Sequence, residues 1–139
     1  MFSQLERGKI GSASINAAIA SGLRKTTVAV ANTGTPDGKA NITGQVTDAN
    51  GKSVAGRHLI ALFIDNAAYG DPEDLGTLAA KANSRLLKEL TDDALAYVLT
   101  HSDGSWGVEL TLAANGTVHA HAAVAGTFAT ANAAITGVA

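Results

Sequence analysis

The chain has 139 residues, a formal net charge of −2 and no cysteine. Its length predicts one domain, with a core large enough to fold without a disulfide. The lack of cysteine excludes disulfides and thiolate metal sites. Charged residues make up only 16% of the chain and aromatic residues 4%. These contents argue against a nucleic-acid-binding surface and against a platform on which bases stack.

Hydrophobic residues reach 46%, but many of them are alanine, which buries little area. We therefore expect a thin core that gains stability from neighbouring subunits. The first seven residues contain no uninterrupted apolar run of the kind found in signal peptides. No apolar run approaches the roughly 18 residues that a membrane helix needs. The expectation is a soluble protein that is made in the cytoplasm and has no membrane contact.

Residues 1–25 differ from the rest of the chain, because apolar residues alternate loosely with glycine and serine. The stretch 14–20 allows a helical turn or two, with Ser12 or Ser14 as the N-cap. Two interpretations stay open: a tail packed on its own domain, or an arm that docks onto a neighbouring subunit. In the second, the partner-contact residues are the large apolar ones: Phe2, Leu5, Ile10, Ile15, Ile19 and Leu23.

Strand patterns begin at Thr26. Residues 26–31 are rich in β-branched side chains, and 42–47 place Ile42 and Val46 on one face. Asn50-Gly51 then supplies a tight turn. The run 58–64 is apolar on both faces, so we expect it at the centre of a sheet, or with its second face against a partner.

The region from Asn66 to Thr91 is ambiguous. Asp71-Pro72 has the composition of a helix start, and Leu75, Leu78 and later residues keep a helical period. Residues 84–90 are equally compatible with a short strand. We favour a long loop with one short helix, and a loop of this length in a compact sandwich is usually functional.

Strand patterns return at Leu95. Residues 95–99 alternate, Trp106 heads an alternating strand over 105–112, and Asn115-Gly116 turns the chain into a return strand over 117–124. A last, weak strand is expected over 128–135. Seven or eight short strands at regular spacing predict an all-β fold, an antiparallel β-sandwich over residues 26–139 that follows the N-terminal arm 1–25.

Two stretches carry a resemblance. DANGKSVAGRHLIALFI (48–64), followed by THSDGSWGVELTL (100–112), resembles the bacterial immunoglobulin-like modules of the invasin and intimin type. With IDNAAYG (64–70), the chain looks more like the immunoglobulin-like structural proteins of tailed bacteriophages. The resemblance covers about residues 40–125 and implies an immunoglobulin-like virion protein. It transfers no catalytic residue.

Few residues suggest chemistry. His119 and His121 share a strand face, but a zinc site would need a third ligand that the sequence does not identify. Asp48-Ala49-Asn50-Gly51 resembles the opening of a calcium loop, yet Lys52 stands where an oxygen ligand is needed, so a turn is favoured. The acids in 71–74 and 92–93 are typical of solvated caps. We expect no catalytic residue, no cofactor and no metal.

The sequence thus predicts a non-enzymatic virion structural protein. We favour a bacteriophage capsid decoration (cement) protein, a homotrimer that binds the major capsid protein or another virion protein and stabilises the assembled shell. One alternative is a phage tail, neck or fibre component. Another is a recognition module that binds a host-surface glycan or receptor through residues 66–91.

Overall fold

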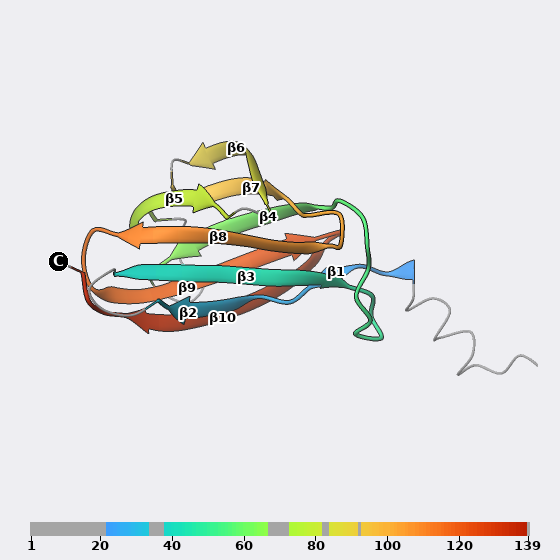
Figure 1. Cartoon of the computed structure of the whole chain (residues 1–139), viewed down its shortest axis with the longest axis horizontal. Helices are drawn as coiled ribbons and strands as arrows, with labels where there is room; N and C mark the ends of the chain where they lie inside the picture. Colours follow the sequence, from blue (N-terminus) through green and yellow to red (C-terminus); the bar gives the residue numbers. More distant parts are fainter. Residues whose placement is uncertain (1–21, 34–37, 67–72, 82–83, 92, 139) are drawn as a thin grey trace, which may run out of the picture.

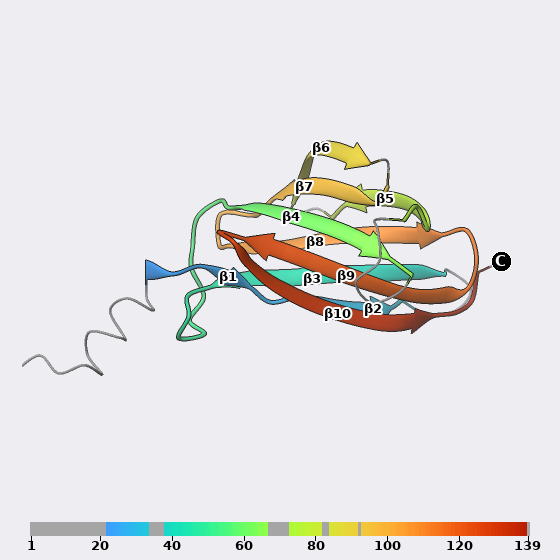
Figure 2. The same ribbon diagram turned by 180° about the vertical axis from the view of Figure 1, so that it is seen from behind.

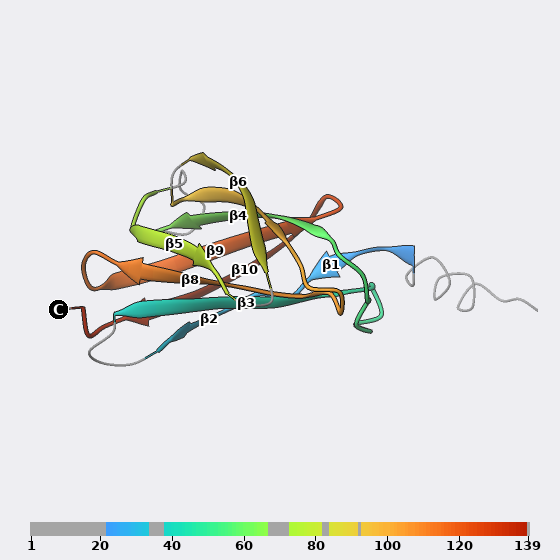
Figure 3. The same ribbon diagram turned by 45° about the horizontal axis from the view of Figure 1, so that its top comes forward.

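The computed structural model describes residues 22–33, 38–66, 73–81, 84–91 and 93–138. These residues form an all-β structure of two antiparallel sheets packed face to face, as the sequence predicts (Figure 1). Figure 3 shows the sheets as separate layers. Within the described ranges, no helix has the length and apolar character that crossing a membrane requires.

Each sheet contains five strands. Sheet 1 has the order β1-β3-β8-β5, and β2 also pairs with β3. Its strands are β1 (Lys25–Thr26), β2 (Ala29–Asn32), β3 (Lys39–Thr47), β5 (Gly76–Ala80) and β8 (Ser105–Leu112). Sheet 2 has the order β10-β9-β4-β7-β6. Its strands are β4 (Leu59–Asp65), β6 (Arg85–Thr91), β7 (Leu95–Leu99), β9 (Gly116–Val124) and β10 (Thr127–Ile135).

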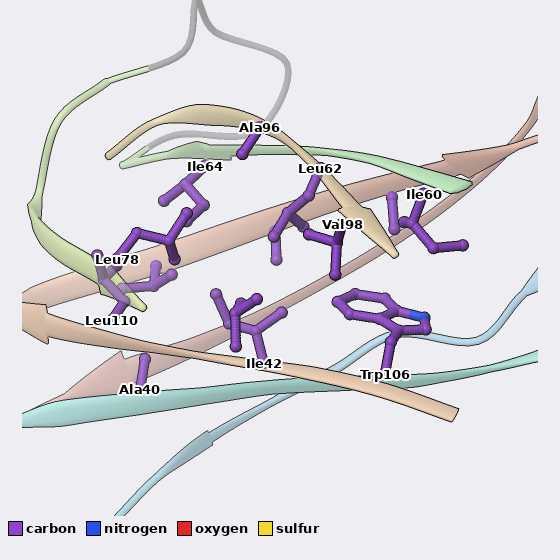
Figure 4. Packing of buried hydrophobic residues seen from close by; sticks show 14 of the residues in the cluster. Ala40, Ile42, Ile60, Leu62, Ile64, Leu78, Ala96, Val98, Trp106 and Leu110 are labelled. Carbon is purple, nitrogen blue, oxygen red and sulfur yellow. The ribbon is translucent and has the colours of Figure 1, made fainter. Parts of the chain in front are cut away.

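Alternating side chains of the long strands fill the space between the sheets (Figure 4). Ile42 and Val46 on β3 are fully buried, as the alternation predicts. On β8 and β9 the expected inward faces are also confirmed, and their members are Trp106, Val108, Leu110, Leu112, Val118, Ala120, Ala122 and Val124. The core is built from valine, isoleucine, leucine and alanine around a single indole.

Trp106 anchors the first strand to this core. Its indole Nε1 donates a buried hydrogen bond of 2.8 Å to Thr26 Oγ1 on β1. Gly44 lies opposite Trp106 in the register of β3 and β8, and an added Cβ there would clash with the indole and with the Thr27 carbonyl. The close approach therefore requires glycine at this position. The expected strand 26–31 is present as two pieces, β1 and β2, on the same edge of β3.

Strand β4 lies in the middle of sheet 2, between β9 and β7. This confirms the central position that its two apolar faces predict. The strand expected to be weak, β10, instead pairs with β9 over nine residue pairs, from Thr127↔Val124 to Ile135↔Gly116.

The helix expected between Asn66 and Thr91 is not found in the described residues of that region. Residues 76–80 and 85–91 are strands β5 and β6, whereas residues 67–72, including Asp71 and Pro72, lie outside the described ranges. Tertiary contacts explain the difference. Leu78 is 5% exposed in the core, and its amide donates a 2.6 Å hydrogen bond to Asp93 Oδ1. Pairing with β8 thus overrides the local helical period.

Candidate functional site

The outer faces of the two sheets differ in chemistry. On sheet 1 the outward side chains are polar or small, and two polar pairs are bonded across strands. Lys39 Nζ lies 3.4 Å from Glu109 Oε1, and Lys81 Nζ donates a 2.8 Å hydrogen bond to Asn41 Oδ1. Such a face is stable in water without cover.

The outer face of sheet 2 is apolar over β4 and β7 and the adjoining part of β9, and Arg85 and Lys88 of β6 border it in the register. Because Ile60, Leu62 and Ile64 point inward, the other side of β4 presents Leu59, Ala61 and Phe63. The registers of β7, β9 and β10 place more apolar and aromatic groups beside them. We call this surface the apolar face, made up of Leu59, Ala61, Phe63, Leu95, Tyr97, Leu99, His121, Ala123 and Phe128. Figure 2 views the sandwich from the side of sheet 2.

Two of these side chains are open to solvent, and the others are half-buried or buried. Phe128 is 68% exposed and Leu59 is 49% exposed. The other large hydrophobic residues exposed in the described part are Leu87, Leu90 and Leu23. The first two lie on β6 of the same sheet, and the third precedes β1. A contiguous apolar surface on one face of a soluble domain is typical of a protein contact.

An aromatic cluster lies at the centre of the apolar face. The rings of Phe63 and His121 are stacked, with centroids 4.3 Å apart and an interplanar angle of 13°. Phe128 meets Phe63 edge to face at 6.4 Å. Burial lowers the pKa of His121 below its ordinary value; the carboxylate of Asp65 acts in the opposite direction, and His119 lowers the pKa further. Burial therefore favours the neutral imidazole, which suits an apolar contact.

His119 and His121 share the outer face of β9, as the alternation predicts, and Asp65 lies opposite His119 in the register. In the described ranges, no group of three or more His, Cys, Asp or Glu side chains is arranged to hold a metal ion. His121 instead belongs to the aromatic cluster, and His119 and Asp65 lie beside it on β9 and β4.

The other chemical candidates form local structure. Asp48 Oδ1 accepts hydrogen bonds from the amides of Asn50 (2.9 Å) and Lys52 (3.0 Å), which is the expected turn. Ser105 bonds to Asp103 through its hydroxyl at 2.6 Å. These side chains stabilise turns at one end of the sandwich.

A shallow groove of about 300 Å³ lies at the opposite end, lined by Asn66, Asp74, Leu75 and residues 112–117. Two of its polar groups are engaged in turn structure. Asp74 Oδ1 accepts from the Gly76 amide at 3.0 Å, and Asn115 Oδ1 accepts from the Val138 amide at 3.0 Å. The groove is therefore a minor feature beside the apolar face.

The predicted partner-contact residues of the arm fall mostly outside the described ranges. Phe2, Leu5, Ile10, Ile15 and Ile19 lie there, and only Leu23 is described, with 53% of its surface exposed. The next residue, Arg24, accepts a 3.1 Å hydrogen bond through its carbonyl from Thr127 Oγ1. The described chain thus begins beside the β9–β10 turn, next to Phe128.

Sequence reasoning identified the two apolar faces of β4 but not the full apolar face. Phe128 and Tyr97 were missed as surface residues, because their contribution depends on which strands neighbour β4. One signal was available: residues 95–99 are apolar at odd and even positions alike.

No protein-family model matches the sequence, and no curated protein matches it. Among solved structures, the bacterial hydrophobin BslA has a TM-score of 0.49 and 14% identity, covering 81% of this chain and 98% of that chain. A glycosyl hydrolase family 2 member from Bacteroides cellulosilyticus has a TM-score of 0.46 and 14% identity, covering 81% of this chain. The match spans only 14% of the hydrolase. MtrC from Shewanella baltica OS185 has a TM-score of 0.44 and 13% identity, covering 98% of this chain and 27% of that one. Likenesses of this size assign neither a family nor an activity.

Proposed function

We propose that this chain is a non-enzymatic structural protein of a bacteriophage virion, a capsid decoration (cement) protein that binds and stabilises the assembled shell. The observation that carries the proposal is the apolar face of sheet 2. The sandwich already has a closed core between its sheets, and Leu59 and Phe128 stay exposed outside it. The composition of the apolar face suits burial against protein.

Burial of the exposed side chains of the apolar face supplies the free energy of docking. Fully burying a Leu or Phe side chain contributes roughly 1.5–3 kcal/mol. Phe128 and Leu59 each retain about half or more of their exposure. Covering these two residues and their neighbours supplies several kcal/mol, which a free monomer forgoes. A shell-bound protein recovers this free energy on docking.

The immunoglobulin-like part of the proposal is supported by the strand order. The series β2-β3-β8-β5 and β10-β9-β4 correspond to strands A-B-E-D and G-F-C of an immunoglobulin domain. Strands β7 and β6 extend the second sheet, as C′ and C″ do in variable domains. The chain order departs from that pattern, since the strand in the D position, β5, precedes β6 and β7.

A tail, neck or fibre location would use the same face against a different virion protein. A recognition module is the second candidate function, and one observation favours it. The groove beside Asn66 and Asp74 lies at the start of the region expected to bind a glycan or receptor. Such a module should still bind host cells when residues of its apolar face are substituted.

Cosedimentation with empty capsids of the phage whose genome carries this chain tests the proposal. The informative variant is Phe128→Asp, which places a charge on the apolar face. The matched control is Thr111→Asp, at an exposed position on the outer face of sheet 1. We expect Phe128→Asp to weaken capsid binding by at least about tenfold, because loss of an aromatic anchor residue costs about 2 kcal/mol or more. Equal binding by both variants, or no binding by the wild type, would overturn the proposal.

A further inference from the structure

We propose that residues 1–21 of a second copy of this chain cover the apolar face, so that copies associate by exchanging their N-terminal segments. The inference rests on the proposed function in one respect: the shell brings the copies together, and the protein that covers the apolar face is then a neighbouring copy rather than a capsid subunit. It goes further by naming the occupant. Four observations carry it: the place where the described chain begins, its direction there, the composition of the segment, and the size of the face.

The described chain begins beside the apolar face. Thr127 Oγ1 donates a 3.1 Å hydrogen bond to the carbonyl of Arg24, and Thr127 directly precedes the exposed Phe128. Two residues later, Thr26 is fixed to the core by the hydrogen bond from Trp106 Nε1. The start of the N-terminal segment is therefore anchored at one corner of sheet 2.

The direction of the chain favours a neighbouring copy over the chain's own face. β1 is antiparallel to β3, and Lys25 pairs with Thr47, the last residue of β3. The chain therefore enters β1 from beyond the end of the sandwich. To reach its own sheet 2, the segment would have to reverse direction near Gly22. A segment continued in the direction of β1 would lead away from its own sandwich, toward where a second copy can meet it.

The segment matches the face in length and chemistry. It contains 21 residues, which span up to about 70 Å when extended and about 30 Å as a helix. A five-stranded sheet is only about 20–25 Å wide. The large apolar residues of the segment are Phe2, Leu5, Ile10, Ile15 and Ile19. Charged residues of β6, Arg85 and Lys88, lie at one border of the apolar face.

The area of the apolar face is too small for two copies to form a stable dimer by packing these faces against each other alone. The five strands of sheet 2 average about seven residues and present roughly 600 Å² per copy. A standard interface buries about 800 Å² per partner. In an exchange, each copy contributes both a face and a segment, so the buried area per copy grows well beyond that of one sheet. A reciprocal exchange between two copies gives a two-fold dimer, and an exchange passed from copy to copy gives a ring where the rotation closes.

Crosslinking of the full chain tests the inference cleanly, because the chain has no cysteine. One variant carries Ser12→Cys in the segment. The other carries Thr130→Cys, at an exposed, outward position of β10 that leaves Phe128 intact. The two variants are mixed and treated with a short bis-maleimide reagent. The control mixture pairs Ser12→Cys with Thr111→Cys, at the exposed position on sheet 1.

We expect the Ser12/Thr130 mixture to give at least about tenfold more crosslinked dimer than the control mixture, because docking raises the effective thiol concentration to the millimolar range. Equal yields in the two mixtures would overturn the inference. A doubly substituted chain, S12C with T130C, tests the alternative occupant. If it crosslinks only within single chains at micromolar concentration, the segment covers its own face and the inference fails.

Capsid cosedimentation of the same variants separates this inference from the proposed function. Capsid binding without crosslinking between chains contradicts the exchanged segment alone. Crosslinking between chains without capsid binding contradicts the capsid role and leaves the exchange supported.

Discussion

Phe63 lies flat against His121 on the outer side of sheet 2, with their ring centroids 4.3 Å apart. The two residues are direct partners in the register of β4 and β9. His121 is only 2% exposed, although its strand face looks away from the core. A titratable ring is thus buried within the apolar face, and its charge state should affect both stability and association.

This burial predicts a pH dependence. Burial lowers the pKa of His121 below its ordinary value of 6.5, Asp65 partly opposes the shift and His119 adds to it. Below pH 6.5 the unfolded chain binds more protons at this position than the folded chain does. The free energy of unfolding should therefore be fully retained above that pH and fall as the pH drops toward the folded-state pKa. Urea unfolding at pH 7.5, 6.5 and 5.5 measures it, and His121→Phe, which keeps a stacked ring, should lose this contribution.

The hydrogen bond between Trp106 and Thr26 gives a second prediction. Thr26→Val preserves shape but leaves the buried indole N–H without its acceptor. We expect the free energy of unfolding to fall by about 1–3 kcal/mol in urea titrations. Thr43→Val, at an exposed position of β3, is the control and should change it by less than about 0.5 kcal/mol. Equal effects would show that the hydrogen bond does not hold β1.

The turn at Asp48 gives a third prediction. Its carboxylate accepts two backbone amides, so Asp48→Ala should cost about 1–3 kcal/mol, whereas Asp48→Asn keeps an acceptor and should cost less. Calcium should leave the melting temperature unchanged. A real site would add about 2.7 kcal/mol at 100 times its Kd, so a clear thermal shift with calcium would contradict the turn assignment.

The inward faces of β3, β8 and β9 could be predicted because side chains in a strand alternate strictly, so the apolar period alone separates the core from the surface. The strand at 76–80 could not, whereas the strand alternative for residues 84–90 is confirmed by β6. Leu78 and its neighbours have a helical period, but the backbone of β5 pairs with β8 and bonds to Asp93, fifteen residues away from Leu78. Local sequence contains no information on such a partner.

The apolar face was predictable only in part, for a related reason. The run 58–64 showed that β4 has two apolar sides, but the sequence does not state that Tyr97 and Phe128 lie on neighbouring strands. Their grouping follows from the sheet order, which is set by contacts distant in the chain. The proposed arm contacts stay a prediction, since five of the six residues lie outside the described ranges.

The last prediction concerns β6, an edge strand of sheet 2. Its pairing with β7 shifts register at two places, once at Leu87 and once at Leu90. Bulges and charges are the usual means by which an exposed edge avoids pairing with another chain. Strand β6 carries the charged residues Lys88 and Glu89. The double variant Lys88→Val with Glu89→Val should therefore raise aggregation, measured by light scattering and thioflavin fluorescence at matched concentration. The free energy of unfolding should change little, because both positions are exposed. The control variant, Thr43→Val with Thr111→Val, adds two valines to strands that are already paired on both sides. Its solutions should show no increase in light scattering or thioflavin fluorescence. If both pairs aggregate alike, added hydrophobicity rather than the open edge is responsible.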